Sequence, residues 1–199
     1  MKYSDIYRLY STSQPKDAIH QALREVPVDD SDEQYEDRSP LHLACQYGDT
    51  EGVKILLERD AEPNTKDANG STPIHILGRT SAGCADEDKL KEIAVMLIEQ
   101  GANIPRSAKN TTALIECIRN RHFKMAEAII DSGARVNSTD LNGENVLFGF
   151  CAASGDIRRD IRFAKKELDE SVQYRYPENK IEEIRSRIAT VSYTHLRAH

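Results

Sequence analysis

The apolar residues between positions 39 and 64 fall into two short groups with helical spacing. Each group occupies one face of a helix: Leu41, Ala44 and Cys45 form the first, and Val53, Leu56 and Leu57 form the second. Ser39 can cap the first helix, with Pro40 at its first position, where a missing N–H costs nothing. Gly48 can adopt the left-handed conformation that ends this helix. The pattern therefore predicts two short antiparallel helices joined by a tight turn.

The same pattern recurs along the chain. Leu41, Ile74, Leu114 and Leu147 occupy equivalent places, separated by 33, 40 and 33 residues. A single helix pair of this kind cannot bury both of its faces, whereas stacked neighbours share a continuous core. The sequence therefore predicts a stacked array of helix pairs.

The segment 39–45, Ser-Pro-Leu-His-Leu-Ala-Cys, is similar to the motif T-P-L-H-x-A-A of the ankyrin repeat. The later elements V-V-x-L-L-L and G-A-D-V-N have counterparts at 53–57 and 133–137, and the period of about 33 residues is that of the family. This resemblance implies an all-α ankyrin-repeat solenoid of stacked antiparallel helix pairs with projecting turn fingers. It also implies that the motif histidines, His42 and His75, form structural hydrogen bonds. Neither histidine has a metal-spaced partner in the sequence.

The spacing divides the chain into four parts. Residues 1–38 are predicted to form a degenerate N-terminal capping repeat followed by an acidic linker, and residues 39–144 three ankyrin repeats. The second repeat carries eight extra residues between its helices, within 79–88. Residues 145–190 are expected to form a divergent fourth repeat that is truncated. Residues 191–199 resemble the translation of a sequencing adapter and are interpreted as an artefact.

Two charged segments leave alternatives open. The linker at 29–38 carries six carboxylates, and we favour a solvated connector over an acidic binding loop. The predicted amphipathic helix from Ile157 to Leu168 has a basic first half. We favour a solvated face over a nucleic-acid site there, because no aromatic platform accompanies the basic residues. The formal net charge of -6 also argues against a nucleic-acid or anionic-membrane surface.

The sequence contains no constellation typical of an enzyme. Of the four cysteines, Cys45, Cys117 and Cys151 fall at small-residue positions of first helices and are predicted to be buried thiols, whereas Cys84 lies in the insertion. No C-x-x-C motif and no Gly-rich phosphate loop occur. We therefore expect no catalytic residue, no cofactor and no metal. The sequence has no apolar run of membrane-spanning length and no signal core, so a cytoplasmic location is expected.

The resemblance implies a non-catalytic module that binds another protein through the finger tips and the first helices. It places the contacts at Gln46, Tyr47, Lys66, Asp67, Asn69, Arg106, Lys109, Glu116, Arg119, Asn120, Asp140 and Asn142. The alternative is the targeting domain of a larger enzyme or effector with its catalytic part beyond the C-terminus. The identity of the partner is not encoded in a readable way. We expect a monomer, apart from association through an exposed C-terminal edge.

Overall fold

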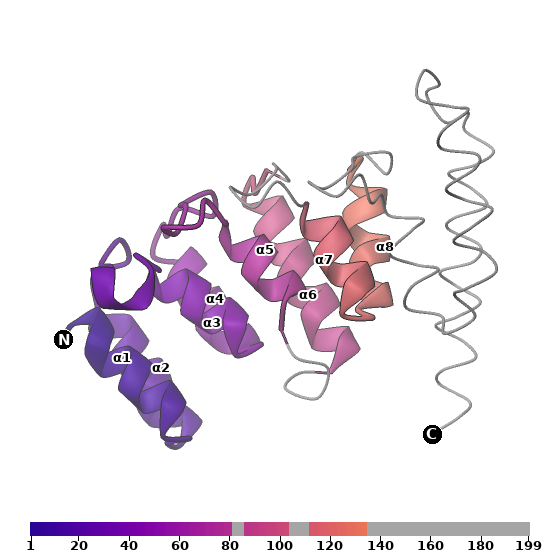
Figure 1. Ribbon diagram of the computed structural model, residues 1–199. Helices are drawn as coiled ribbons and strands as arrows, with labels where there is room; N and C mark the ends of the chain where they lie inside the picture. The colour runs from indigo at the N-terminus through magenta and orange to yellow at the C-terminus, as the bar shows by residue number, and fades with distance from the viewer. Residues whose placement is uncertain (81–85, 104–111, 135–199) are drawn as a thin grey trace, which may run out of the picture.

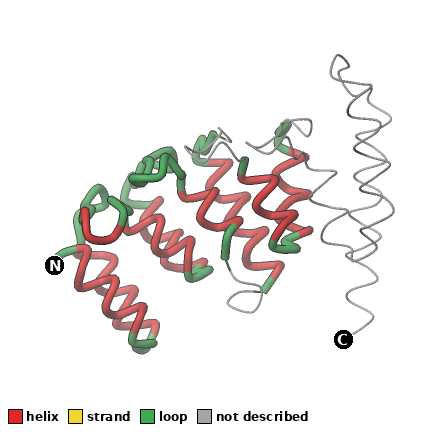
Figure 2. The backbone as a smooth tube through the Cα atoms, viewed as in Figure 1, coloured by secondary structure: helices red, strands yellow, loops and turns green. Residues whose placement is uncertain are grey.

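The computed structural model describes residues 1–80, 86–103 and 112–134 (Figure 1). Within these ranges the regular elements are helices, joined by turns and loops (Figure 2), so the all-α prediction is confirmed. The helices are α1 (Tyr3–Ser11), α2 (Lys16–Glu25), the 3-10 helix η1 (Glu33–Tyr35), α3 (Pro40–Gln46), α4 (Thr50–Leu57), α5 (Pro73–Gly78), α6 (Glu87–Glu99), α7 (Ala113–Arg119) and α8 (Phe123–Asp131).

The helices form two layers of a solenoid. Within each pair the two helices pack together, as α3 does with α4 and α5 with α6. Along the stack, α1, α3, α5 and α7 contact one another in order, and α2, α4, α6 and α8 do the same. The loops that lead from α2 to α3 and from α4 to α5 lie at the same edge of the stack (Figure 1). These loops are the fingers implied by the repeat pattern.

Local sequence explains where the first helix of each pair begins. Ser39 and Thr72 precede α3 and α5, each followed by a proline at the first helical position and a histidine two residues later. The third copy lacks both proline and histidine, but the hydroxyl of Thr112 accepts a hydrogen bond of 3.3 Å from the backbone N–H of Ile115. The cap is therefore retained although the motif is not.

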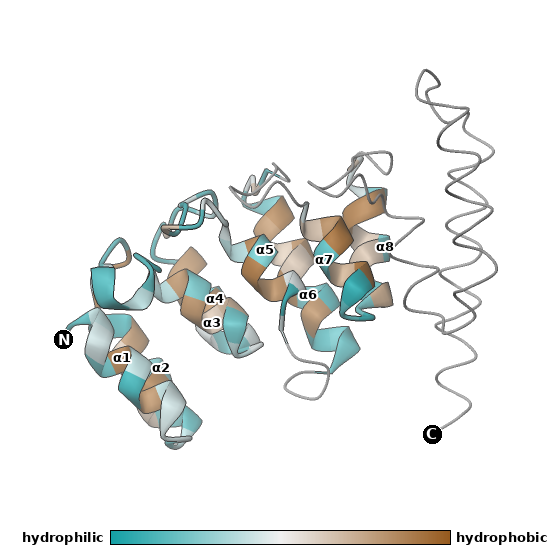
Figure 3. Ribbon diagram, in the orientation of Figure 1, coloured by the Kyte–Doolittle hydropathy of each residue, from teal (hydrophilic) through white to brown (hydrophobic). Residues whose placement is uncertain are grey.

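The predicted inner faces form the core. The buried apolar residues form one cluster that includes residues of α1 to α8, and hydrophobic and hydrophilic positions are mixed along each helix (Figure 3). Leu56 and Ile129, predicted at inner positions of second helices, are fully buried. The separation between α5 and α6 is longer than in the other pairs, with eight residues between Gly78 and Glu87 against three between α3 and α4. The connection is therefore five residues longer than in the first full repeat, and α6, with 13 residues, is five residues longer than α4, with 8.

The N-terminal pair α1 and α2 packs against the first full repeat. Its buried residues include Tyr3, Ile6 and Leu23. Arg59, just beyond α4, donates from Nη1 to the carbonyl oxygens of Leu23 and Val26, the latter at 2.8 Å. These carbonyls lie at the C-terminal end of α2, where helix carbonyls lack partners within the helix. Arg59 thus fastens the N-terminal pair to its neighbour.

The prediction of a merely solvated connector at 29–38 is incomplete. Tyr35 of η1 packs its ring on Tyr7, with centroids 4.3 Å apart, and on Tyr3, at 5.7 Å. The carboxylate of Asp30 accepts a hydrogen bond of 2.7 Å from the backbone N–H of Tyr3. The connector is therefore docked on α1 by an aromatic cluster, although Glu33 and Glu36 remain exposed.

Several predictions concern residues outside the described ranges. They are the third finger with Arg106 and Lys109, the fourth finger with Asp140 and Asn142, the thiols Cys84 and Cys151, the basic helix at 157–168, the divergent repeat at 145–190 and the terminal segment 191–199. These remain predictions, as do the boundaries of the predicted domains.

Candidate protein-binding surface

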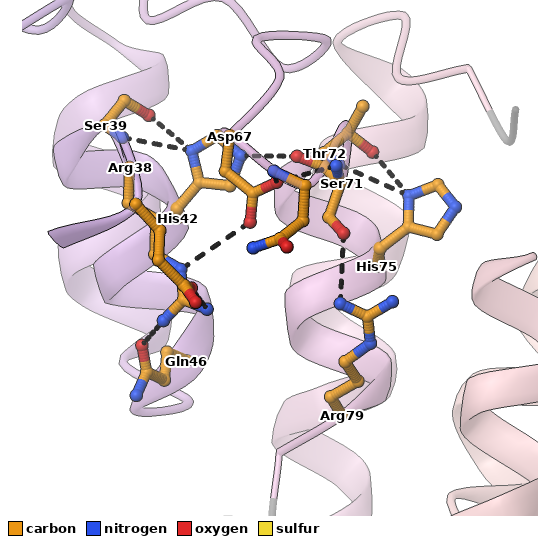
Figure 4. Close-up of polar contacts among 11 residues, drawn as sticks. Arg38, Ser39, His42, Gln46, Asp67, Ser71, Thr72, His75 and Arg79 are labelled. Carbon is orange, nitrogen blue, oxygen red and sulfur yellow. Dashed lines mark hydrogen bonds and ion pairs between the residues drawn. The ribbon is translucent and has the colours of Figure 1, made fainter. Parts of the chain in front are cut away.

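A polar network runs across the first helices and the first full finger (Figure 4). Arg38 donates from Nη1 to Gln46 Oε1 at 2.8 Å, and its Nε lies 3.7 Å from Asp67 Oδ2. Arg38 precedes α3, Gln46 ends α3, and Asp67 lies in the next finger. The network therefore joins a first helix to the finger that follows it. Gln46, a predicted contact residue, is half-buried within it.

The buried carboxylate of Asp67 stabilises the turn of the first full finger through hydrogen bonds to its backbone. Its Oδ1 accepts hydrogen bonds from the backbone N–H of Asn69, at 2.9 Å, and of Ser71, at 2.8 Å. Its side chain is fully buried. An aspartate that binds backbone amides two and four residues ahead closes a turn of the kind that Asx residues favour. The prediction of Asp67 as a contact residue therefore needs correction, because its carboxylate is used within the finger.

The motif histidines have the structural role that the resemblance implied. The backbone N–H of Ser39 donates to His42 Nδ1 at 3.1 Å, so this nitrogen carries no proton. His42 Nε2 therefore donates, at 3.0 Å, to the carbonyl oxygen of Ser71 in the next finger. Burial lowers the pKa of His42, against the opposing effect of the Ser71 carbonyl. His75 forms the equivalent cap with the Thr72 hydroxyl, 3.0 Å from its Nδ1.

A second network joins α5 to α7. Arg79 donates from Nε to Glu116 Oε1 at 3.1 Å and from Nη1 to the Ser71 hydroxyl at 3.0 Å. Asn120 donates from Nδ2 to the carbonyl oxygens of Gly78, at 3.0 Å, and of Glu116, at 2.9 Å. Two predicted contact residues, Glu116 and Asn120, are thus held in fixed positions by bonds between repeats.

Tyr47 lies at the C-terminal end of α3, with its ring stacked on Tyr10 of α1 at 4.8 Å between centroids. Tyr47 was predicted from the sequence as a contact residue for a partner. The structure shows it half-buried against the N-terminal pair. Only part of the ring therefore remains available for a partner.

The exposed members of the predicted set lie on the finger and on α7. Lys66 and Arg119 are exposed and Asn69 is half-buried. Backbone and side-chain bonds connect neighbouring fingers: the Ala68 N–H donates to the carbonyl oxygen of Glu36 at 2.8 Å, and Asn64 Nδ2 donates to that of Gly101 at 3.0 Å. The loop after α4 is therefore bonded to described residues of the loops on both sides of it.

The cysteines and the possible metal ligands of the described residues were predicted from the sequence to be structural. Cys45 and Cys117 are buried free thiols, as predicted, and burial raises the pKa of each. No group of three or more His, Cys, Asp or Glu residues in these ranges could hold a metal ion. None of the helices described is long and apolar enough to cross a membrane.

One buried polar cluster was not predicted from the sequence. Asp49, between α3 and α4, accepts a hydrogen bond of 2.8 Å on Oδ2 from the Tyr10 hydroxyl, and His20 Nε2 lies 3.0 Å from both of its carboxylate oxygens. Burial, followed by the negative charge of Asp49, raises the pKa of Tyr10. His20 and Tyr10 lie 29 and 39 positions from Asp49 in the chain, and the three residues share no motif. Only the packing of neighbouring helix pairs brings them together.

Comparison with known proteins agrees with this architecture. A family model described as ankyrin repeats in many copies matches residues 22–77. The Caenorhabditis elegans homolog of transient receptor potential cation channel subfamily A member 1 is 38% identical over 69 residues, which is 35% of this chain and 6% of the relative. Mouse neurogenic locus notch homolog protein 1 is 31% identical over 134 residues, 67% of this chain and 5% of the relative. Ankyrin repeat protein nuc-2 of Neurospora crassa is 29% identical over 124 residues, 61% of this chain and 10% of the relative.

The fold and these matches define a helical solenoid of the repeat-protein class. The chain is an ankyrin-repeat protein. Ankyrin repeats as a class are protein–protein interaction modules. The chain spans no more than a tenth of the length of the relatives named above.

Proposed function

We propose that this chain is a non-catalytic module that binds another protein in the cytoplasm and is itself a monomer. Its contact surface, here called the finger–groove surface, comprises the predicted residues other than Asp67. In the described ranges these are Gln46, Tyr47, Lys66, Asn69, Glu116, Arg119 and Asn120. Arg106, Lys109, Asp140 and Asn142 belong to the same proposed surface, but lie outside those ranges.

The observation that best supports this proposal is the fixed geometry of the surface. Gln46 is tied to Arg38, and Glu116 to Arg79, by side-chain hydrogen bonds of 2.8 and 3.1 Å. Polar groups that are already ordered lose little conformational entropy when a partner binds. Solenoids also present extended surfaces suited to proteins. A surface of this kind favours recognition of a folded or extended polypeptide over catalysis.

Affinity measurements with matched charge reversals test this assignment. After a partner has been identified by affinity capture with the full chain, its Kd is measured for Lys66→Glu combined with Arg119→Glu. We expect binding to weaken by about tenfold or more, since like charges opposed across an interface are costly. Lys54→Glu is the control, because Lys54 is exposed on α4, in the other helix layer.

The melting temperature should stay unchanged in both variants, because exposed substitutions rarely alter stability. The pair Arg106→Glu and Lys109→Glu tests the third finger in the same assay. Loss of binding in the Lys54 control alone, or full affinity in both finger–groove variants, would contradict the proposed surface.

The second candidate function, a targeting domain within a larger enzyme or effector, is favoured by one comparison. The similar segments amount to 5% of the notch homolog and 6% of the channel homolog. In those proteins the matching repeats therefore belong to far longer chains. Reading the gene beyond the codon for Thr190 tests this candidate: an open frame that encodes a catalytic domain supports it, and a stop codon there contradicts it.

A further inference from the structure

The side-chain amide of Gln46, on the finger–groove surface, is held in one orientation by Arg38. Arg38 Nη1 lies 2.8 Å from the oxygen of this amide. A guanidinium can only donate, so the atom that faces it must be the amide oxygen, and Gln46 Nε2 points away from Arg38 (Figure 4). This nitrogen is not buried, and its N–H groups form no hydrogen bond with the described part of the chain. Gln46 therefore offers hydrogen-bond donors to another molecule.

The amide of Asn120 is held the opposite way round. Its Nδ2 donates to the carbonyl oxygens of Gly78, at 3.0 Å, and of Glu116, at 2.9 Å. Carbonyl oxygens can only accept, so the atom that faces them must be the amide nitrogen, and both of its N–H groups are used. The oxygen, Asn120 Oδ1, is not buried and accepts no hydrogen bond from the described residues. Asn120 therefore offers an acceptor.

The two amides lie at the C-terminal ends of two helices in the same layer. Gln46 is the last residue of α3, Asn120 is the C-cap residue of α7, and α5 lies between these helices and contacts both. Packed helices are about 8–10 Å apart, so the two amides are separated by about 16–20 Å across the layer. An extended polypeptide advances about 3.3 Å per residue and crosses this distance with about five or six residues.

We propose that the finger–groove surface binds an extended segment of its partner through the main chain of that segment. A main-chain carbonyl accepts from Gln46 Nε2, and a main-chain N–H, about five or six residues away, donates to Asn120 Oδ1. This inference rests on the proposed function and adds which part of the partner is recognised. Arg38 is a positioning residue, because it determines which end of the Gln46 amide faces the partner.

Two observations favour a main chain over a charged ligand. Every residue of a polypeptide except proline carries one N–H and one carbonyl, so a single extended segment supplies both of the groups that the two amides require. Arg79, at the end of α5 between them, already forms an ion pair of 3.1 Å with Glu116. The middle of the row is thus occupied by a neutralised pair, which suits an uncharged main chain. Main-chain hydrogen bonds are a common source of affinity for extended peptides.

Replacement of main-chain amides in a bound peptide by esters tests the proposal. A peptide of about ten residues, long enough to cross the layer, is selected from a random displayed library on the full chain. Each ester then removes one N–H and weakens the preceding carbonyl as an acceptor. We expect esters at two places, about five or six residues apart, to weaken binding about three- to tenfold each, the effect of one neutral hydrogen bond. A scan without two such places overturns the proposal.

The contact with Gln46 is tested by Gln46→Glu and by Gln46→Met, which both remove the N–H donors, with and without a new charge. In either variant the ester opposite this residue should weaken binding less than about twofold, because the hydrogen bond is already lost. Gln21→Glu is the matched control, since Gln21 is exposed on α2 in the other helix layer. It should retain the full ester effect. An ester effect that persists in both Gln46 variants overturns the proposal.

Arg38→Met tests the positioning role. The amide of Gln46 is then no longer ordered before binding, so affinity for the unmodified peptide should fall about threefold. Affinity for the peptide with the ester opposite Gln46 should change less, and Arg38→Lys, which keeps a donor, should restore binding. Equal losses for both peptides would mean that Arg38 has a merely structural role and would overturn this part of the proposal.

The same peptides separate this inference from the proposed function. If Lys66→Glu combined with Arg119→Glu weakens binding but no ester does, the protein-binding surface stands and recognition of the main chain is overturned. If the selection yields no peptide that this pair of substitutions weakens, the surface itself is overturned, and the inference with it.

Discussion

Gly52 lies in α4 beside the buried Tyr10–Asp49 pair, and its replacement by alanine sets two effects against each other. A Cβ at this position would lie 2.7 Å from Asp49 Oδ2 and 2.9 Å from the Tyr10 hydroxyl, both closer than a Cβ contact tolerates. Alanine favours a helix over glycine by about 1 kcal/mol. Displacement of the buried pair leaves a donor or a carboxylate poorly satisfied, which costs about 1–3 kcal/mol and more for a charged group. We therefore expect Gly52→Ala to destabilise the fold by about 1–2 kcal/mol.

Urea unfolding monitored by circular dichroism measures this loss for the single variant, for Tyr10→Phe and for the double variant. Removal of the Tyr10 hydroxyl takes away one of the two atoms that the new methyl group meets. The two substitutions should therefore be non-additive, with a coupling of about 0.5 kcal/mol or more. A stabilised Gly52→Ala would refute the reasoning, because it would show that the helix preference is unopposed and the pair moves freely.

Three further outcomes are expected. Leu56→Ala and Ile129→Ala should each cost about 2–5 kcal/mol in urea unfolding, and a loss below about 1 kcal/mol would show that the side chain is not part of the core. Arg121 stands at φ 65° where the first repeat has a glycine, so Arg121→Gly should stabilise by about 1 kcal/mol; an unchanged or lower melting temperature would contradict this. Burial lowers the pKa of His42 in the folded state, whereas the histidine of the unfolded chain binds a proton below about pH 6.5. The free energy of unfolding therefore decreases as the pH is lowered below that value. The advantage of His42 over His42→Asn in urea unfolding should shrink as the pH falls from about 7 to about 5.5, and a constant difference would contradict the neutral cap.

The repeat architecture could be predicted because it is encoded locally. The features that determine each helix pair lie within that pair: caps such as Ser39, turn glycines such as Gly48, and apolar residues three or four apart. The repeat period then places the same features in each successive pair. The turn is kept even at Arg121, which stands where the first repeat has the turn glycine Gly48. The structure keeps the left-handed turn, and an arginine takes a conformation that glycine adopts more easily.

The polar chemistry between repeats could not be predicted in the same way. Whether Asp67 points outward or closes its own turn depends on a hydrogen-bond geometry that the motif leaves open. Tyr47 was placed by its helical position, but Tyr10, from a different helix pair, stacks on it. The ring of His122 lies near the Thr80 carbonyl and the Glu87 carboxylate only because neighbouring helix pairs pack together. The contacts of Tyr47 and His122 join residues far apart in sequence, whereas those of Asp67 depend on the local geometry of its turn.

The bonds from Arg59 to the end of α2 bear on how the solenoid unfolds. In a linear array each unit contacts only its neighbours, so cooperativity depends on the strength of every interface. Arg59 reaches across the interface between the N-terminal pair and the first full repeat. If this arginine were replaced by methionine, the apolar stem would be kept and the two carbonyl partners lost. The first two helices would then melt as a separate unit ahead of the rest, and a single transition would become two.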